Sequence, residues 1–490
     1  MYKSRKGQQS ILEDARAFGG VHLDMNNEWI KLGRLIPWDE FEAEYGATFQ
    51  GAATGNPAKP ARMALGTLLI KERYQFSDED ILKEVQMNPY LQHFIGMAEF
   101  THKAPFDAST ITLFRQRTTP QMLARLNDCI IGLKGREKRG DEPPEVPPSA
   151  GGDRPEENKE GSQEEKKGTL ILDATCAPQG IRYPTDISLL NEARELLEKM
   201  VTKGYKAGAW VQKPRTYCRT ARRDYLRYAR NRKPTLKQLR KAIKKQLGYV
   251  ARDIRYVQDL LERNEQWLSE RMRAQFATIE QLYRQQQQMH QTRTHSVEDR
   301  IVSIHQPWVR PIVRGKATAA VEFGAKIAVA LYGGYARVET LCWDAFNEGG
   351  TLQASVERYK DATGHYPARI LADKIFRTRD NLNFCKKHDI HLNGPRLGRP
   401  PKDLALYRAQ CRQEKAEAGE RSAIECTFGV GKRRYSLGYI TTKLQHTSKV
   451  AMHLVFLSMN LQKRLLSLLR YFFRECFRRD PSLFCLPESS

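Results

Sequence analysis

Three acidic residues, far apart in the chain, have sequence surroundings that suit chemistry on phosphate groups. Asp173 in LILDAT and Asp373 in ILADK each end a short apolar run that predicts a buried strand. Glu425 lies in the segment ERSAIECTFGVGK, which predicts a helix. In open α/β sheets, ligands and catalytic groups gather at strand ends. We therefore expect the two strands to bring their aspartates to one pocket and the helix to add the glutamate.

Glu425 shares its predicted helix face with two cations. With Arg421 set at 0° and ~100° per residue, Glu425 falls at about 40° and Lys432 at about 20°. Taken alone, a carboxylate beside two cations is more often an exposed ion pair, which contributes little to stability. Gly429 and Gly431 also weaken the helix prediction near Lys432.

Two aspartates and a glutamate in one pocket would form a dense negative site with hard oxygen ligands. Such a site needs cations, and Mg²⁺ or Mn²⁺ suits carboxylates when substrate phosphates complete the ligand shell. Two ions about 3.5–4 Å apart would clamp the attacking and leaving oxygens of an in-line phosphoryl displacement. Arg421 and Lys432 would then steady the flanking phosphates.

These motifs resemble those of bacterial insertion-sequence transposases of the DDE class, in the branch whose third acid sits in a Y-x2-R-x3-E-x6-K signature. Arg421, Glu425 and Lys432 match the R, E and K at the required spacing, whereas Ala418 stands at the tyrosine position. LILDAT and ILADK are similar to the first and second aspartate motifs of that family. The alanine at position 418 leaves the assignment of the three acids intact, but it removes any DNA contact that the family makes with the tyrosine ring.

The resemblance implies an α/β fold with an RNase H-like catalytic core, in which a mixed sheet carries Asp173 and Asp373 and a later helix carries Glu425. It implies metal-dependent hydrolysis at transposon ends, followed by attack of the freed 3′-hydroxyl on target DNA. Asp173 would bridge two Mg²⁺ or Mn²⁺ ions, and the other two acids would each hold one. Glu420 is a weaker choice for the third acid because it fails the signature spacing.

The composition favours a polyanionic partner. The chain has 490 residues, with 81 Lys and Arg against 57 Asp and Glu and a formal charge of +24. Such an excess favours nucleic acid first and an anionic membrane surface second. Cations interrupt the most apolar stretch, residues 451–473, so no membrane span is expected. Nine cysteines without a CxxC pair, and no recognisable secretory signal, favour a reducing cytoplasm. The resemblance implies that this is the cytoplasm of a bacterium, with the protein associated with the nucleoid.

The strongest local charge lies in residues 203–245, which hold sixteen Lys and Arg and one acid, Asp224. A net charge of +15 repels itself, so a polyanion partner is favoured over a merely solvated helix face. Aromatic residues alternate with these cations, and such rings suit base stacking and core packing equally. Residues 203–300 lack strand patterning and predict a basic helical insertion. The candidate DNA-binding cations there are Arg215, Arg219, Arg222 and Arg223, and the segment VRGK adds Arg314 and Lys316.

Helices and a linker complete the expected organisation. Residues 1–118 predict short helices, one starting at Pro60 and another capped by Ser77. They suit either a DNA-binding domain or a small packing bundle, and they resemble the N-terminal DNA-binding segment of the family. Residues 140–168 hold five Pro, five Gly and nine acidic residues and predict a flexible linker. The expected divisions are an N-terminal DNA-binding domain (1–118), a helix leading out of it (119–139), the linker (140–168), the catalytic domain (169–202 and 301–445), the basic insertion (203–300) and a C-terminal helical segment (446–490).

Three functions stay open at the level of the sequence. The leading one is an active transposase that acts on terminal repeats and target DNA, with a homodimer as the default for pairing two ends. The second is a DNA-binding derivative that keeps the fold without cutting, although the three acids at their motif positions argue against it. The third is a structure-specific nuclease on the same fold, which would cleave without joining.

Overall fold

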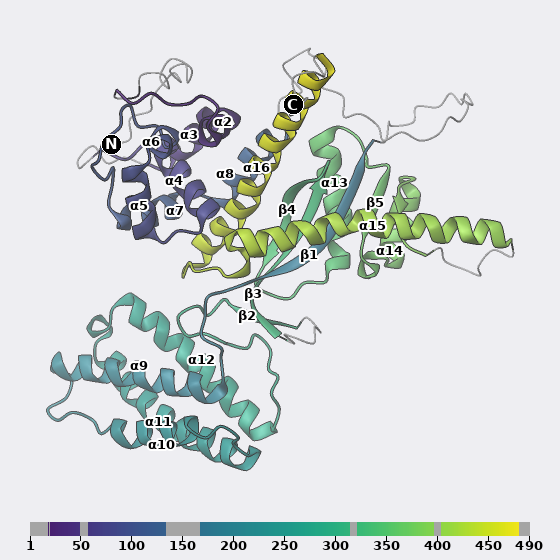
Figure 1. Ribbon diagram of the computed structural model, residues 1–490. Coiled ribbons are helices and arrows are strands. Elements are labelled where there is room, and N and C mark those ends of the chain that lie inside the picture. The colour runs from purple at the N-terminus through teal and green to yellow at the C-terminus, as the bar shows by residue number, and fades with distance from the viewer. Residues whose placement is uncertain are drawn as a thin grey trace, which may run out of the picture.

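The computed structural model describes residues 18, 20–49, 57–133, 167–313, 321–395 and 403–479, with side chains up to residue 471. It is an α/β fold with a mixed sheet, a helical N-terminal region and a further set of helices between the first two strands (Figure 1). The predicted α/β class and helical N-terminal region are therefore confirmed. Arg314, Lys316 and residues 140–166 of the expected linker lie outside the described residues.

The sheet has six strands, in the order β2–β3–β1–β5–β6, with β4 also paired to β3. β3 is antiparallel to β1, whereas β5 and β6 continue the sheet in parallel on the other side of β1. β2 pairs with the first residues of β3 and β4 with the later ones. The strands are β1 (Thr169–Pro178), β2 (Arg310–Val313), β3 (Val321–Tyr332), β4 (Tyr335–Cys342), β5 (Arg369–Ala372) and β6 (His391–Leu392).

The prediction that the first strand ends at Asp173 is wrong. β1 continues to Pro178, because it pairs antiparallel with β3 over residues 170–178. Its parallel pairing with β5 stops at Leu172 and Ala372, which lie opposite each other. Asp173 is thus the first residue beyond the parallel pairing, and Asp373 is the first residue after β5, as predicted for that strand.

Helices cover both faces of this sheet. One face packs against α13 through a core that includes Leu172, Tyr332 and Val356. The other face packs against α15 and α16, which contribute Ile424 and Phe456 to its core. Figure 1 shows α15 crossing in front of the strands. The helices on the two faces are α13 (Leu352–Thr363), α14 (Arg379–Lys387), α15 (Leu404–Arg434) and α16 (Gln445–Arg479).

Four helices between β1 and β2 form what we call the helical unit. They are α9 (Asp186–Lys206), α10 (Cys218–Ala229), α11 (Leu236–Arg263) and α12 (Glu270–Thr292). Thr185 begins α9 with a capping box, since its hydroxyl accepts from the backbone of Ser188 and the Ser188 side chain accepts in return. Leu197, Val257 and Ile279 share one buried cluster. The helical unit therefore has a hydrophobic core of its own.

The N-terminal region consists of short helices that pack on α16. Ser77 caps its helix as predicted, because its hydroxyl accepts from the Asp80 backbone N–H. α16 is shared by two cores: Leu454 and Leu461 belong to the N-terminal cluster, and Met452 belongs to the cluster on the sheet. The helices are α2 (Glu28–Leu35), α3 (Trp38–Ala47), α4 (Ala61–Tyr74), α5 (Asp78–Met87), α6 (Pro89–Phe94), α7 (Ala108–Arg117) and α8 (Pro120–Ile130).

None of the helices in the described part of the chain combines the length and apolarity that a membrane crossing requires.

Candidate active site

The two aspartates lie next to each other at the end of the parallel strand pair. Because Leu172 and Ala372 are register partners, the residues that follow them, Asp173 and Asp373, leave the pair side by side. One carboxylate oxygen of Asp173 accepts from the Ala174 N–H at 2.8 Å, and that of Asp373 accepts from the Lys374 N–H at 2.7 Å. The Asp173 side chain is only 16% exposed. The sheet therefore places two carboxylates side by side, each fixed by a hydrogen bond from the next backbone N–H.

α15 brings a guanidinium and a third carboxylate to Asp173. Ile424 and Phe428 are buried against the sheet, which orients the helix so that Arg421 faces β1. Arg421 donates from Nη1 to Oδ2 of Asp173 at 3.3 Å and from Nη2 to Oε1 of Glu425 at 2.7 Å. One cation therefore links two of the acids predicted from the sequence, and the i,i+4 spacing on the helix makes this possible.

Burial dominates the electrostatics of Asp173. Burial raises the pKa of Asp173 to about 6, and the carboxylates of Glu348 and Asp373 raise it as well. The Ala174 N–H and the Arg421 guanidinium act in the opposite direction. Since the net shift is upward, these favourable contacts do not make up for the cost of burying the charged carboxylate.

Glu348 is a residue near this site that sequence reasoning missed. It begins the 3-10 turn η2 (Glu348–Thr351), and its carboxylate pairs with Nζ of Lys326 on β3 at 2.9 Å. η2 packs against η3 (Lys374–Phe376), the turn that follows Asp373. An added Cβ on Gly349 would lie 2.6 Å from the Ile375 carbonyl oxygen, so the two turns are in close contact. No periodicity or motif in the sequence connects Glu348 with the other acids.

Glu420, the rival for the third acid, lies elsewhere. Its carboxylate forms two hydrogen bonds with Arg369, at 3.1 and 2.7 Å. Arg369 begins β5, and a strand rise of about 3.3 Å per residue puts it about 13 Å from the position of Asp373. The geometry thus favours Glu425 over Glu420 as the neighbour of the aspartates.

Lys432 lies in the last turn of α15, which continues to Arg434 in spite of its two late glycines. Gly431 is buried where the helix meets Leu437 and Met459, since an added Cβ would lie 3.0 and 3.3 Å from their side chains. Close packing at this position therefore explains a glycine that sequence reasoning took as a weakness of the helix.

The donor set of the site suits a hard divalent cation. Carboxylate oxygens are the ligands that Mg²⁺ and Mn²⁺ prefer, and a cation would offset the cost of burying the charged Asp173 carboxylate. Among the described residues, no three His, Cys, Asp or Glu side chains are arranged as a ready set of metal ligands. The guanidinium of Arg421 lies between Asp173 and Glu425, so these two acids meet a cation of the chain itself.

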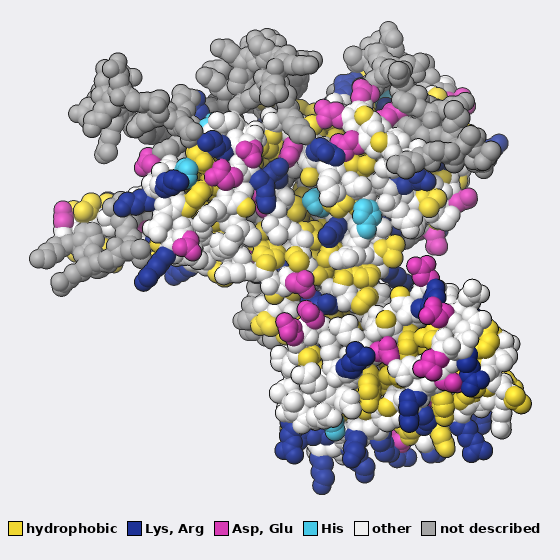
Figure 2. All heavy atoms as spheres, turned by 180° about the vertical axis from the view of Figure 1, so that it is seen from behind, with side chains coloured by type: hydrophobic (Ala, Val, Ile, Leu, Met, Phe, Trp, Pro, Cys, Tyr) yellow, Lys and Arg dark blue, Asp and Glu magenta, His cyan; other side chains and the backbone are white. Residues whose placement is uncertain are grey.

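The predicted DNA-binding arginines of the helical unit lie together, apart from the acids. Arg215 precedes α10, and the other three lie on α10 and are exposed. Figure 2 shows Lys and Arg side chains gathered along the lower edge of the helical unit, where α10 and α11 run in Figure 1. The sheet lies above this unit, so these cations form a surface of their own.

Comparison with known proteins gives two matches to protein families. Residues 20–117 match a "Transposase domain (DUF772)", and residues 370–462 match a "Transposase DDE domain". A relative from Rhizobium meliloti, "Uncharacterized protein ORF8 in nfe locus", is 30% identical over 201 residues, which are 41% of this chain and 83% of that protein. No solved structure matches. The DDE match contains Asp373 and Glu425 and the other contains most of the N-terminal helices, and the chain belongs to the DDE transposases of insertion sequences.

Proposed function

We propose that this chain is an active DNA transposase that cleaves at transposon ends in a metal-dependent reaction and joins the 3′-hydroxyl to target DNA. The observation that carries the proposal is the adjacency of Asp173 and Asp373 in the sheet, together with the Arg421 link from Asp173 to Glu425. A mixed sheet with both aspartates and a later helix with the glutamate supports an RNase H-like core.

In this proposal, Asp173, Asp373 and Glu425 hold the metal ions. When bound, two divalent ions would stabilise charge on the attacking and leaving oxygens of the phosphodiester. Arg421 and Lys432 orient the flanking phosphates, for which a planar guanidinium offers two parallel donors. The pair between Lys326 and Glu348 ties η2 to β3, and η2 in turn packs against η3, the turn that follows Asp373.

DNA would be held mainly by charge on other surfaces. The arginines of the helical unit (Arg215, Arg219, Arg222 and Arg223), together with Arg314 and Lys316, contact backbone phosphates, and the N-terminal helices bind the ends. Pairing of two transposon ends requires two active sites, so the chain works as a homodimer, in the bacterial cytoplasm at the nucleoid.

The test uses the full chain and linear DNA that carries the terminal repeats of its own element. With Mg²⁺ we expect cleaved ends and products joined to target DNA, and with EDTA neither. Cleavage without joining and without need of the repeats would instead establish a structure-specific nuclease. Binding of the repeats without any cleavage would establish a non-cutting derivative.

The pH dependence of cleavage should follow Asp173. Its pKa of about 6 means that the carboxylate gains a proton as the pH falls through that value, and a protonated acid holds a cation poorly. We expect the single-turnover rate to fall about tenfold per pH unit below about 6 and to level off above it. Because a bound cation competes with the proton, raising the Mg²⁺ concentration should move the fall to lower pH. Circular dichroism at each pH controls for unfolding, and a rate that stays constant down to pH ~5 would contradict the assignment of Asp173.

A further inference from the structure

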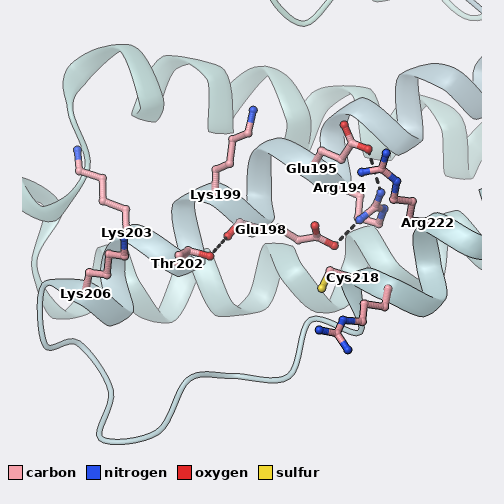
Figure 3. A pocket seen from close by; sticks show the side chains of 10 residues that line it. Arg194, Glu195, Glu198, Lys199, Thr202, Lys203, Lys206, Cys218 and Arg222 are labelled. Carbon is pink, nitrogen blue, oxygen red and sulfur yellow. Dashed lines mark hydrogen bonds and ion pairs between the residues drawn. The ribbon is translucent and has the colours of Figure 1, made fainter.

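The helical unit contains a cavity that lies outside the candidate active site. Its volume is about 720 Å³, and it is lined by side chains of α9 and of the beginning of α10 (Figure 3). None of the described residues that line it is aromatic, and most carry a charge. We call it the α9–α10 groove.

Lysines form one wall of the groove and arginines the other. Three lysines on α9 are spaced four and three residues apart, namely Lys199, Lys203 and Lys206. At ~100° per residue they fall within a ~60° arc of one helix face. Figure 3 shows the side chains of Lys199 and Lys203 pointing the same way from the helix. Arg219 and Arg222 on α10 are three residues apart and also line the groove.

A buried arginine pairs with both acids of the groove. Arg194 is 1% exposed and pairs with Glu198 and, at 3.3 Å, with Glu195, while its Nη2 also donates to Asn191 at 2.8 Å. Its Nε has no hydrogen-bond partner in the described structure. A buried donor without a partner is costly, so Arg194 stabilises the fold less than a fully bonded arginine would.

The groove therefore has an excess of positive charge. Its lining holds six cations and two acids, so its formal net charge is +4. Both acids pair with Arg194. Within the described part of the chain, no carboxylate pairs with the remaining cations of the two walls, namely Lys199, Lys203, Lys206, Arg219 and Arg222. Like charges held this close repel each other, and a polyanion removes the repulsion.

We propose that the α9–α10 groove binds consecutive backbone phosphates of DNA and thereby anchors it away from the site of cleavage. This inference rests on the proposed function in taking DNA as the partner. Lys199 and Lys206 lie about 10.5 Å apart along the helix axis, a span longer than one phosphate group requires. Contacts to backbone phosphates carry no sequence information, so binding in the groove should not depend on the DNA sequence.

The first test measures the salt dependence of DNA binding with the full chain in EDTA, where no cleavage is needed. For duplex DNA, each lost phosphate contact reduces the slope of log K against log[salt] by about 0.9. We therefore expect Lys199→Gln/Lys203→Gln/Lys206→Gln to reduce the slope by up to about 2.7. The control is Arg379→Gln/Lys386→Gln/Lys387→Gln, which removes the same charge from exposed positions of α14 and should leave the slope unchanged. Equal slopes for the two variants would overturn the proposal.

The second test measures whether DNA covers the groove, from the rate at which Cys218 is labelled. Cys218 is an exposed thiol in the lining of the groove. With DNA at about ten times its Kd, we expect maleimide labelling of Cys218 to slow about tenfold in the wild type and in the α14 variant, but not in the lysine variant. Labelling at an unchanged rate, or protection by anionic lipid vesicles and not by DNA, would overturn the proposal. If the chain binds DNA in this way but never cleaves it, the groove stands and the proposed function fails.

Discussion

Asp173→Asn is expected to reduce cleavage at transposon ends by about 10³-fold, because charge stabilisation by metal ions at a phosphoryl transfer is worth several kcal/mol. The amide keeps the shape of the side chain and can still accept from the Ala174 N–H, but it carries no charge for a cation. The measurement is the single-turnover rate with Mg²⁺ on DNA that carries the terminal repeats.

The same substitution should leave the melting temperature at pH ~7.5 unchanged or higher. The Asp173 pKa of about 6, against an ordinary value of 3.8, corresponds to on the order of 3 kcal/mol of cost for the charged form in the folded protein. Because the folded pKa is raised, the stabilisation from the bound proton is present below the unfolded pKa and is lost as the pH rises through about 6. An amide avoids that cost, although Arg421 loses a charged partner.

The matched control for this prediction is Asp361→Asn, at an exposed position on α13. It should change neither the cleavage rate nor the melting temperature. If Asp173→Asn cleaves at the wild-type rate, Asp173 is not part of the active site. If its loss of activity comes with a clearly lower melting temperature, the effect is one of folding rather than of chemistry.

Glu425→Gln is expected to reduce cleavage by about 10²–10³-fold, whereas Glu420→Gln should stay within about twofold of the wild type. The two residues make a close comparison, because both lie on α15, both pair with an arginine, and their side chains are 56% and 46% exposed. They differ in which arginine they meet: Arg421 beside Asp173 for Glu425, and Arg369 at the start of β5 for Glu420.

Rates of both variants should be measured on the same DNA, with melting temperatures as a check on folding. A reversed result, with Glu420→Gln inactive and Glu425→Gln active, would assign the third acid to Glu420 and remove the role proposed for the Arg421 link. Equal and small effects would mean that no carboxylate of α15 takes part in cleavage.

Structural features that depend on residues close together in the sequence could be predicted from it. The α/β class, the strand before Asp373 and the cap at Ser77 all follow from apolar spacing and from side chains that bond to their own backbone. The pairing of Arg421 with Glu425 follows from the pitch of a helix. The roles of these acids in catalysis stay predictions until the substitutions above are made.

Other features depend on contacts between distant segments, and the sequence carries no local trace of them. β1 runs past Asp173 because it pairs with β3 as far as Pro178. The charge of Glu348 acts on the pKa of Asp173 because η2 packs on η3, the turn after Asp373. Lys199 lies before residues 203–245, the segment whose charge is strongly basic. It lines the groove only because α9 packs beside α10. The spacing of apolar residues shows which face of a helix or strand is apolar. Which segment packs on that face depends on burial and backbone pairing between segments that are far apart in the chain.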